Sequence, residues 1–311
     1  MRPCEGAISR TIATRPLSGN DAVTSMPQAV SVIIPTYNRV DLIGRALRSV
    51  YAQSVPPCEV IVVDDGSTDG TGSFVNDRFP DALYVKTDQR GVSAARNAGI
   101  MHSRGEWLAF LDSDDQWLPH KLEVQLRQLQ GHTSMRICHT EEIWIRNGRR
   151  VNPARKHAKK GGWIFHACLP LCAMSPSSIL IHRSVFERVG LFDEALPACE
   201  DYDLWLRITA RYPVLFVDEP LILKYGGHAD QLSRRHWGMD RFRIRALEKV
   251  LIAGVLDREC ERAARDMLLR KARIYLEGAR KRGRLDDVDH YEALCRRYSK
   301  EQMNSPETRH G

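Results

Sequence analysis

The chain has 311 residues, of which 43% are hydrophobic and 27% charged, and its net charge is +7. This length and composition are typical of one large globular domain with or without an appendage. No apolar run approaches the roughly 20 residues of a membrane-spanning helix, and residues 1–28 lack the apolar stretch of a secretory signal. We therefore expect residues 1–28 to form a disordered leader and the protein to be cytoplasmic.

The eight cysteines are spaced irregularly and include no CxxC pair, which indicates reduced and mostly packed thiols. His166, Cys168 and Cys172 lie close together in sequence, but a fourth zinc ligand at the usual spacing is missing. The sequence therefore does not favour a disulfide framework or a structural zinc site.

Strands and helices alternate from residue 29 to residue 111. The predicted strands are Val30–Ile34, Glu59–Val63, Leu83–Lys86 and Trp107–Leu111. The predicted helices are Asp41–Gln53, with Asp41 as its cap, Thr68–Asn76 and Val92–His102. Because the strands are apolar throughout, we expect an α/β fold with a Rossmann-like, mostly parallel sheet and helices on both faces.

The second half of the chain mixes short strands and helices and ends in a helical tail. Asn147-Gly148 predicts a hairpin, followed by a basic loop over Asn152–Gly162. The other predicted elements are helices Lys121–Gln130, Val185–Val189 and Asp201–Ala210, strands Ile179–His182 and Val214–Val217, and tail helices Met239–Ile252, Arg258–Lys281 and Asp286–Tyr298. These elements predict one α/β domain over residues 29–231 and a helical C-terminal extension over residues 232–311.

Three predicted strands end in polar loops, Pro35–Asn38, Asp64–Asp69 and Asp112–Asp115. Because parallel strands place their carboxyl ends at one edge of the sheet, these loops should converge on a single crevice. Asp112, Asp114 and Asp115 would repel one another there unless a cation lay between them. Hard divalent ions prefer such oxygen ligands and leave positions open for phosphate oxygens.

The motifs IIPTYNR, VIVVDDGSTDGT, RGVSAARNAGI, WLAFLDSDD and GLFDEALPACEDYDLWLR follow one another over residues 29–230. In this order and spacing the chain resembles family-2 glycosyltransferases of the GT-A fold. The resemblance implies an inverting, metal-dependent transfer of one sugar from a nucleotide-sugar donor, expected to be a UDP-sugar, to a hydroxyl of a glycan or lipid-linked acceptor. The Q-x-x-R-W string of processive members is missing.

The resemblance also implies roles for individual residues. The expected donor-binding residues are Pro35, Thr36, Tyr37 and Asn38 at the base, Asp65 at uracil or ribose, and Arg96, Asn97 and Asp112 along the donor site. Asp112 and Asp114 would form the D-x-D element that holds Mn²⁺ or Mg²⁺, with Asp114 as the direct ligand. His228 is a candidate extra ligand.

The acidic acceptor motif of the family matches Glu200-Asp201. An inverting transfer needs a carboxylate within reach of the acceptor hydroxyl, and we assign Asp201 as that base. Glu200 and Asp203 remain alternatives; on a helix Asp203 points about 200° away from Asp201, so only one of these two can face the sugar.

The sequence fits two other functions less well than sugar transfer. A sugar-phosphate nucleotidyltransferase usually carries a Gly-rich phosphate loop after its first strand, where this chain has PTYNR. A catalytically inactive sugar-nucleotide-binding protein would not need Asp112, Asp114 and Asp201 together. The basic tail lacks a nucleic-acid-binding motif, so no nucleic-acid partner is expected.

The basic excess lies at the end of the chain. Residues 232–311 contain 20 Lys and Arg against 13 Asp and Glu, which accounts for the whole net charge of +7. This charge is consistent with peripheral contact at the anionic inner face of a membrane, or with a solvated helical surface.

Overall fold

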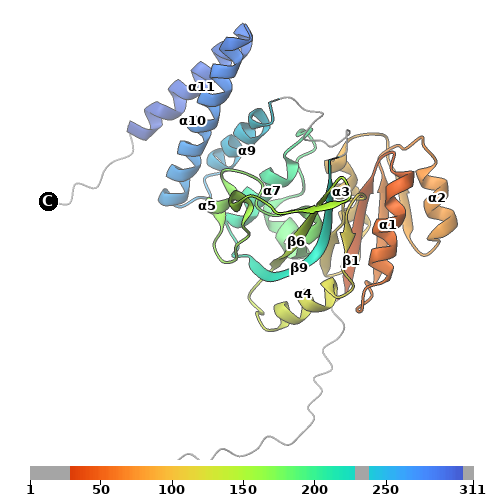
Figure 1. Ribbon diagram of the computed structural model, residues 1–311. Coiled ribbons are helices and arrows are strands. Elements are labelled where there is room, and N and C mark those ends of the chain that lie inside the picture. Colours follow the sequence, from red (N-terminus) through yellow and green to blue (C-terminus); the bar gives the residue numbers. More distant parts are fainter. Residues whose placement is uncertain (1–28, 228–237, 304–311) are drawn as a thin grey trace, which may run out of the picture.

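The computed structural model describes residues 29–227 and 238–303. Within them a nine-stranded sheet is packed between helices, and a long helical hairpin projects from one end (Figure 1). The expected leader over residues 1–28 and the boundary at residue 231 lie outside the described residues.

The described strands are β1 (Val30–Thr36), β2 (Glu59–Asp64), β3 (Leu83–Lys86), β4 (Trp107–Phe110), β5 (Gln116–Trp117), β6 (Ile137–Arg146), β7 (Arg149–Val151), β8 (Leu180–His182) and β9 (Leu215–Gly226). The described α-helices are α1 (Val40–Tyr51), α2 (Thr71–Arg78), α3 (Val92–His102), α4 (Lys121–Gln130), α5 (Phe165–Cys168), α6 (Arg183–Val189), α7 (Glu200–Thr209), α9 (Asp240–Ile252), α10 (Arg258–Lys281) and α11 (Leu285–Met303). Short 3-10 turns cover Arg155–His157 and Pro176–Ser178.

The sheet has the strand order β3-β2-β1-β4-β8-β6-β9-β5, with β7 paired to β6. The first four strands are parallel, so the loops after β1, β2 and β4 open at the same edge. β8 runs antiparallel to β4 and β6, whereas β6 and β9 are parallel. The α/β fold predicted from the sequence is confirmed.

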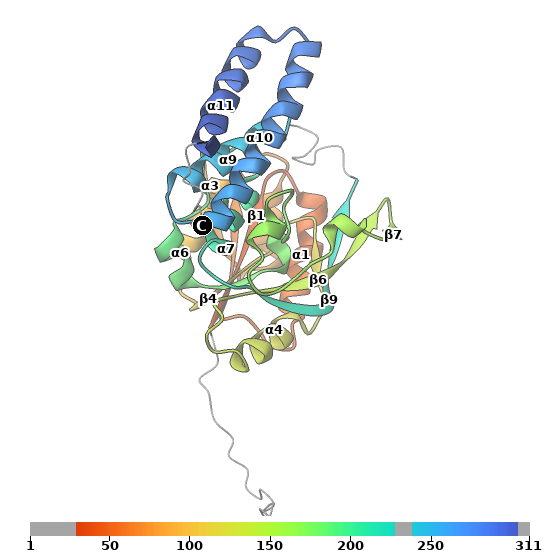
Figure 2. The same ribbon diagram turned by 90° about the vertical axis from the view of Figure 1, so that its left-hand side faces the viewer.

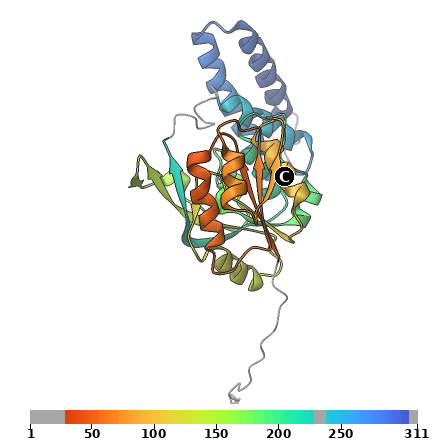
Figure 3. The ribbon, with the colours of Figure 1, turned by 90° about the vertical axis from the view of Figure 1, so that its right-hand side faces the viewer.

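Helices cover both faces of the sheet, so alternate residues of β1 are buried on opposite sides. Val32 and Ile34 pack in one core cluster with Leu47 of α1, while Ile33 packs in another with Ile100 of α3. In Figure 3 the red and orange helices α1 and α2 lie side by side on one of these faces.

The start of α1 differs from the prediction. The helix begins after Arg39, and Asp41 lies in its first turn without capping it. The amide of Val40 instead donates to Asp69 Oδ2 at 3.1 Å, and Asp69 Oδ1 also accepts from Thr71 N at 3.0 Å. Because Asp69 and the left-handed Gly70 form this turn, α2 starts at Thr71 rather than Thr68.

β9 is much longer than the predicted strand Val214–Val217. It continues through the exposed, strand-breaking stretch from Asp218 to Pro220, and its pairing with β6 shifts register next to Glu141. Proline is tolerated at such an irregularity. The longer strand carries Lys224 and Tyr225 to the edge where the loops meet.

The helical tail forms three described helices. α9 packs against α7, because Leu247 and Val250 share a core cluster with Trp205. α10 and α11 form the expected helical hairpin, which stands out from the rest of the molecule (Figure 2). No helix among residues 29–227 and 238–303 is long and apolar enough to cross a membrane.

Candidate active site

A cavity of about 670 Å³ opens at the carboxyl ends of β1, β2 and β4. It is lined by the loops after these strands, the start of α3, the 194–197 loop and the end of β9. Five of the residues expected to bind the donor line this cavity: Pro35, Thr36, Tyr37, Asp65 and Arg96. The carboxylates of the 112–115 loop, described below, line it as well. The predicted convergence of the three polar loops is confirmed.

Asp65 and Asn38 hold these loops in place. The carboxylate of Asp65 accepts from the amides of Arg90 at 2.8 Å and Gly91 at 2.7 Å, which fixes the start of α3 beside the cavity. Asn38 adopts a left-handed backbone, and its Oδ1 accepts from Thr68 N at 2.9 Å. Asn38 is not among the lining residues, so it braces the loops rather than facing the cavity.

Thr36 and Tyr37 present different surfaces to the cavity. Thr36 is 3% exposed, and its buried hydroxyl has no hydrogen-bond partner. The hydroxyl of Tyr37 accepts from Gln89 Nε2 at 2.7 Å. Buried hydroxyls normally find a partner, so the unsatisfied Thr36 Oγ1 is a natural contact for a ligand in the cavity.

Three carboxylates crowd one side of the cavity. Asp115 is buried, and its carboxylate accepts from Ser177 Oγ at 2.6 Å and Tyr225 N at 3.0 Å. Burial, followed by the charges of Asp114 and Asp112, raises the pKa of Asp115 well above its usual range. A cation between these side chains would relieve the repulsion.

The donor set fits a divalent ion shared with a ligand. Among the described residues no group of three or more His, Cys, Asp or Glu side chains is arranged to hold a metal ion by itself. Mg²⁺ is commonly held by one or two carboxylates together with substrate phosphates, which suits the half-buried Asp112 and Asp114. His228, the candidate extra ligand, lies outside the described residues.

Arg96 links the carboxylate cluster to the acidic pair on α7. Its guanidinium is 2.8 Å from Asp112 Oδ1 and 2.6 Å from Glu200 Oε1, and Arg96 and Glu200 are buried. Burial and the neighbouring Asp201 raise the pKa of Glu200, while Arg96 opposes that rise. Arg96 therefore lines the cavity and also positions two acids.

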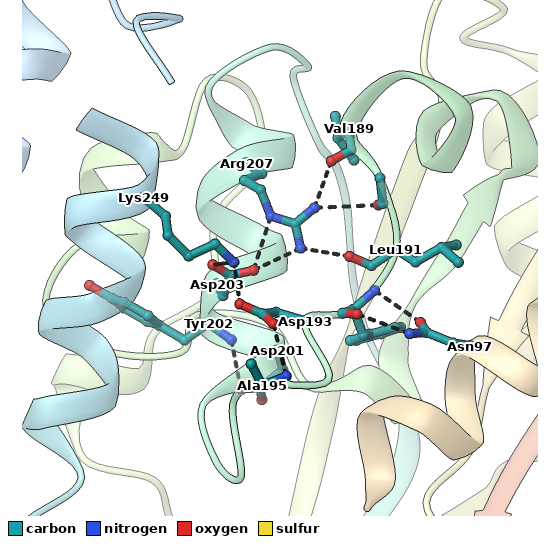
Figure 4. A network of polar contacts seen from close by, with 12 residues as sticks. Asn97, Val189, Leu191, Asp193, Ala195, Asp201, Tyr202, Asp203, Arg207 and Lys249 are labelled. Atoms are coloured by element: carbon teal, nitrogen blue, oxygen red, sulfur yellow. Dashed lines mark hydrogen bonds and ion pairs between the residues drawn. The ribbon is translucent and has the colours of Figure 1, made fainter. Parts of the chain in front are cut away.

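Asn97 positions the loop that leads to α7. It is 6% exposed, its Oδ1 accepts from Phe192 N at 3.0 Å, and its Nδ2 donates to Glu194 Oε1 at 2.9 Å. In Figure 4 dashed lines join Asn97 to the loop over residues 190–197. Asn97 is not among the residues lining the cavity, so in this structure it positions the loop, and its contact with the donor stays a prediction.

The carboxylate of Asp203 is paired with two basic side chains. Its Oδ2 accepts from Arg207 Nη2 at 2.7 Å, and its Oδ1 lies 2.7 Å from Lys249 Nζ (Figure 4). Lys249 of α9 also lies 2.6 Å from Asp193 Oδ2. Asp203, which is 1% exposed, therefore joins α7 to the helical tail through both oxygens of its carboxylate.

Asp201 lies in a different environment. It is half-buried, its Oδ2 accepts from the Cys172 thiol at 3.0 Å, and its Oδ1 accepts from Tyr202 N at 2.6 Å. Burial and then the charge of Asp201 raise the pKa of Cys172 well above its usual range, so this donor is neutral. Neither Asp201 nor Glu200 is among the residues lining the cavity, and the role of Asp201 stays a prediction.

Lys224 is a cavity residue that the sequence did not reveal. It lies near the end of β9 and lines the cavity. Burial lowers the pKa of Lys224, but the nearby acids, Glu142 and Asp115 first, outweigh this effect and raise the pKa overall, so Lys224 stays charged. The predicted strand ended at Val217, so Lys224 had no assigned place. The apolar run Leu221–Leu223 just before it was the available signal.

The sequence matches known families along most of this region. The model of Glycosyl transferase family 2 matches residues 31–189, more than half of the chain, and that of Glycosyltransferase like family 2 matches residues 160–250. The chain belongs to glycosyl transferase family 2. The second match extends from residue 160, at the end of the basic loop, into α9.

Curated relatives agree with this assignment. An uncharacterized glycosyltransferase of Rickettsia felis is 30% identical over 226 residues, which span 66% of this chain and 35% of that protein. The putative colanic acid biosynthesis glycosyl transferase WcaA of Escherichia coli strain K12 is 31% identical over 201 residues, 59% of this chain and 67% of the relative. The chain thus spans about a third of the length of the first relative.

The fold matches that of a solved glycosyltransferase structure. The crystal structure of S. aureus TarS 1-349 in complex with UDP-GlcNAc has a TM-score of 0.63 and 21% identity, over 78% of this chain and 71% of that one. At this identity the match establishes the shared GT-A fold of the two proteins.

Proposed function

We propose that this glycosyltransferase moves a single sugar, with inversion, from a UDP-sugar to a hydroxyl of a glycan or lipid-linked acceptor, and that it needs Mn²⁺ or Mg²⁺. The observation that carries the proposal is the cluster of Asp112, Asp114 and Asp115 in one cavity, joined through Arg96 to the acidic start of α7. The name of WcaA supports a role in surface polysaccharide synthesis, and the UDP-GlcNAc complex of TarS supports a UDP-sugar donor.

The residues divide the work of the reaction. Thr36 and Tyr37 would contact the nucleotide, while Asp112 and Asp114 would hold the ion, which neutralises charge on the departing diphosphate. Lys224 adds a second positive charge at the same cavity. Asp201 would take the proton as the acceptor oxygen bonds to the anomeric carbon and the bond from that carbon to the diphosphate breaks.

A donor screen tests this proposal. The melting temperature of the purified chain is measured with UDP-, GDP- and dTDP-sugars, each with Mn²⁺ and with EDTA. A ligand that binds only the folded state raises this temperature. We expect a UDP-sugar with Mn²⁺ to give the largest rise and EDTA to reduce it; a response to none of these donors would contradict the proposal.

A further inference from the structure

A second cavity of about 260 Å³ lies beneath a basic loop, defined here as residues 155–160. Its nitrogen-bearing lining side chains are Arg155, Lys156, His157, Lys160 and His139. The rest of the lining is apolar and consists of Ala158 and of residues between Ile164 and Ala173; no Asp or Glu of the described residues lines the cavity. The cavity is thus positively charged on one side and apolar on the other.

The basic loop is fixed to β6 by three contacts. Lys159 Nζ lies 3.2 Å from Glu142 Oε2, with both side chains 4% exposed. The ring of His157 is 5.0 Å from that of Trp144, and His139 Nε2 contacts the carbonyl of Lys160 at 2.9 Å. His139 and Glu142 are an odd number of residues apart, and the register shifts beside Glu141 allow both to face the loop.

His139 lines this cavity with a buried, neutral ring. Burial, then the charge of Lys159, lowers the pKa of His139 to about 3, so its imidazole is neutral. Because Nε2 faces the carbonyl of Lys160, it carries the proton, and Nδ1 is left as an acceptor. Nδ1 is fully buried and has no hydrogen-bond partner.

The second cavity adjoins the first through β6 and β9, which lie side by side in Figure 1. Trp144, which contacts His157, is the direct cross-strand partner of Lys224, and Lys224 lines the donor cavity. On another wall Leu171 and Ala173 line the second cavity, and Cys172 between them donates to Asp201. The second cavity therefore lies close to both the donor cavity and the candidate base.

We propose that this second cavity is an acceptor subsite and that it takes a sugar bearing a phosphate or a carboxylate; the assignment as acceptor rests on the proposed function. Arg155, Lys156 and Lys160 supply charge-assisted donors for the anionic group. The apolar wall packs against the sugar ring.

Calorimetric titration of the full chain tests the subsite. UDP with Mn²⁺ is titrated first, and the probes are then added both with UDP saturating and without it. The probes are N-acetylglucosamine 1-phosphate, glucuronic acid and neutral N-acetylglucosamine. The test variant is Arg155→Gln with Lys156→Gln, and its matched control is Arg149→Gln with Arg150→Gln, which removes the same charge from exposed positions on β7.

We expect at least one anionic probe to bind the wild type and the control more tightly than N-acetylglucosamine does. The test variant should weaken that binding roughly tenfold, because two charge-assisted contacts are lost. Binding of the phosphate alone or of the carboxylate alone identifies the anionic group. Failure of both anionic probes, or equal loss in the two variants, would overturn the subsite, whereas failure of UDP alone would count against the proposed donor only.

Binding of the chain to phosphatidylglycerol vesicles is the last measurement of the test. If the basic loop served a membrane surface instead, the test variant would lose vesicle binding while neither anionic sugar bound the wild type. That result would also overturn the subsite.

Discussion

Glu200 and Asp201 are neighbours in sequence, but their carboxylates have different partners. Glu200 is paired with the buried guanidinium of Arg96 at 2.6 Å. Asp201 is hydrogen-bonded only by neutral groups in the contacts described, the Cys172 thiol and the Tyr202 amide. A base must release its partners to accept a proton, and breaking a buried ion pair is unfavourable. This contrast favours Asp201 over Glu200.

Replacing Asp201→Asn should lower kcat by roughly 10²–10⁴-fold, because an amide of nearly the same shape does not accept the proton. Donor binding, followed by calorimetry, should be retained. Glu200→Gln serves as the comparison. An active Asp201→Asn enzyme beside an inactive but folded Glu200→Gln enzyme would show that the assignment is wrong.

Thr36 allows binding to be separated from stability. Its buried hydroxyl has no partner, so Thr36→Val should leave the free energy of unfolding unchanged or raise it, while UDP affinity falls roughly three- to tenfold. Thr209 is a matched control, because its buried hydroxyl donates to Trp205 O at 2.7 Å. Thr209→Val should cost about 1 kcal/mol and leave UDP affinity unchanged; denaturant unfolding and calorimetry measure both quantities. A large loss of stability in Thr36→Val would contradict the ligand-facing role.

The positions of the motifs predicted well which residues lie together at the site. They predicted the contacts of each individual residue less well. The sequence placed Thr36, Asp65 and Asp112 beside one crevice because parallel strands end at a common edge. It did not reveal that Asn97 is hydrogen-bonded to Phe192 and Glu194, because those partners are almost a hundred residues away in the sequence. Such long-range contacts leave no local pattern.

At the scale of elements, α9 is bound to α7 by charge as well as by packing. Lys249 lies 2.7 Å from the buried Asp203 and 2.6 Å from Asp193. The salt bridge therefore links the helical tail, the helix that carries Asp201, and the loop lining the donor cavity.

Lys249→Met should lower the free energy of unfolding by about 1–2 kcal/mol, an estimate reduced because Lys249 is partly exposed. The exposed Lys281→Met on α10 is the control and should be neutral. Urea unfolding checks both variants. If Lys249→Met is as stable as Lys281→Met, the proposed link between α9 and α7 is not important for stability.

Helices were easier to predict than strands in this chain. α3, α4 and α10 begin and end where their apolar periodicity indicated. β9 was predicted as only four residues, because Asp218, Glu219 and Pro220 are unfavourable in a strand. Its pairing with β6 across a register shift overrides that local preference, and the residues it delivers to the site were missed with it.

At the scale of the molecule, the basic tail could bring the enzyme to an anionic membrane. At the turn of the α10–α11 hairpin, Arg280 lies 2.6 Å from Glu292 and Arg284 lies 3.7 Å from Asp287. These acids partly offset the positive charge that the turn presents to a membrane. We expect weak, salt-sensitive co-sedimentation with anionic vesicles, at about 1 kcal/mol per basic residue at the surface. Changing Arg280, Lys281, Arg282 and Arg284 to Gln should weaken it, and no binding at low salt would end this prediction.

The release of UDP from UDP-GlcNAc by the purified chain tests the central claim most directly. We expect Mn²⁺ to be required, EDTA to abolish release, and Asp114→Ala to lower it by orders of magnitude without lowering the melting temperature, because removing one crowded carboxylate relieves repulsion. The exposed Asp218→Ala on β9 should behave like the wild type. Undiminished release in EDTA, or by Asp114→Ala, would contradict a metal-dependent transfer centred on these carboxylates.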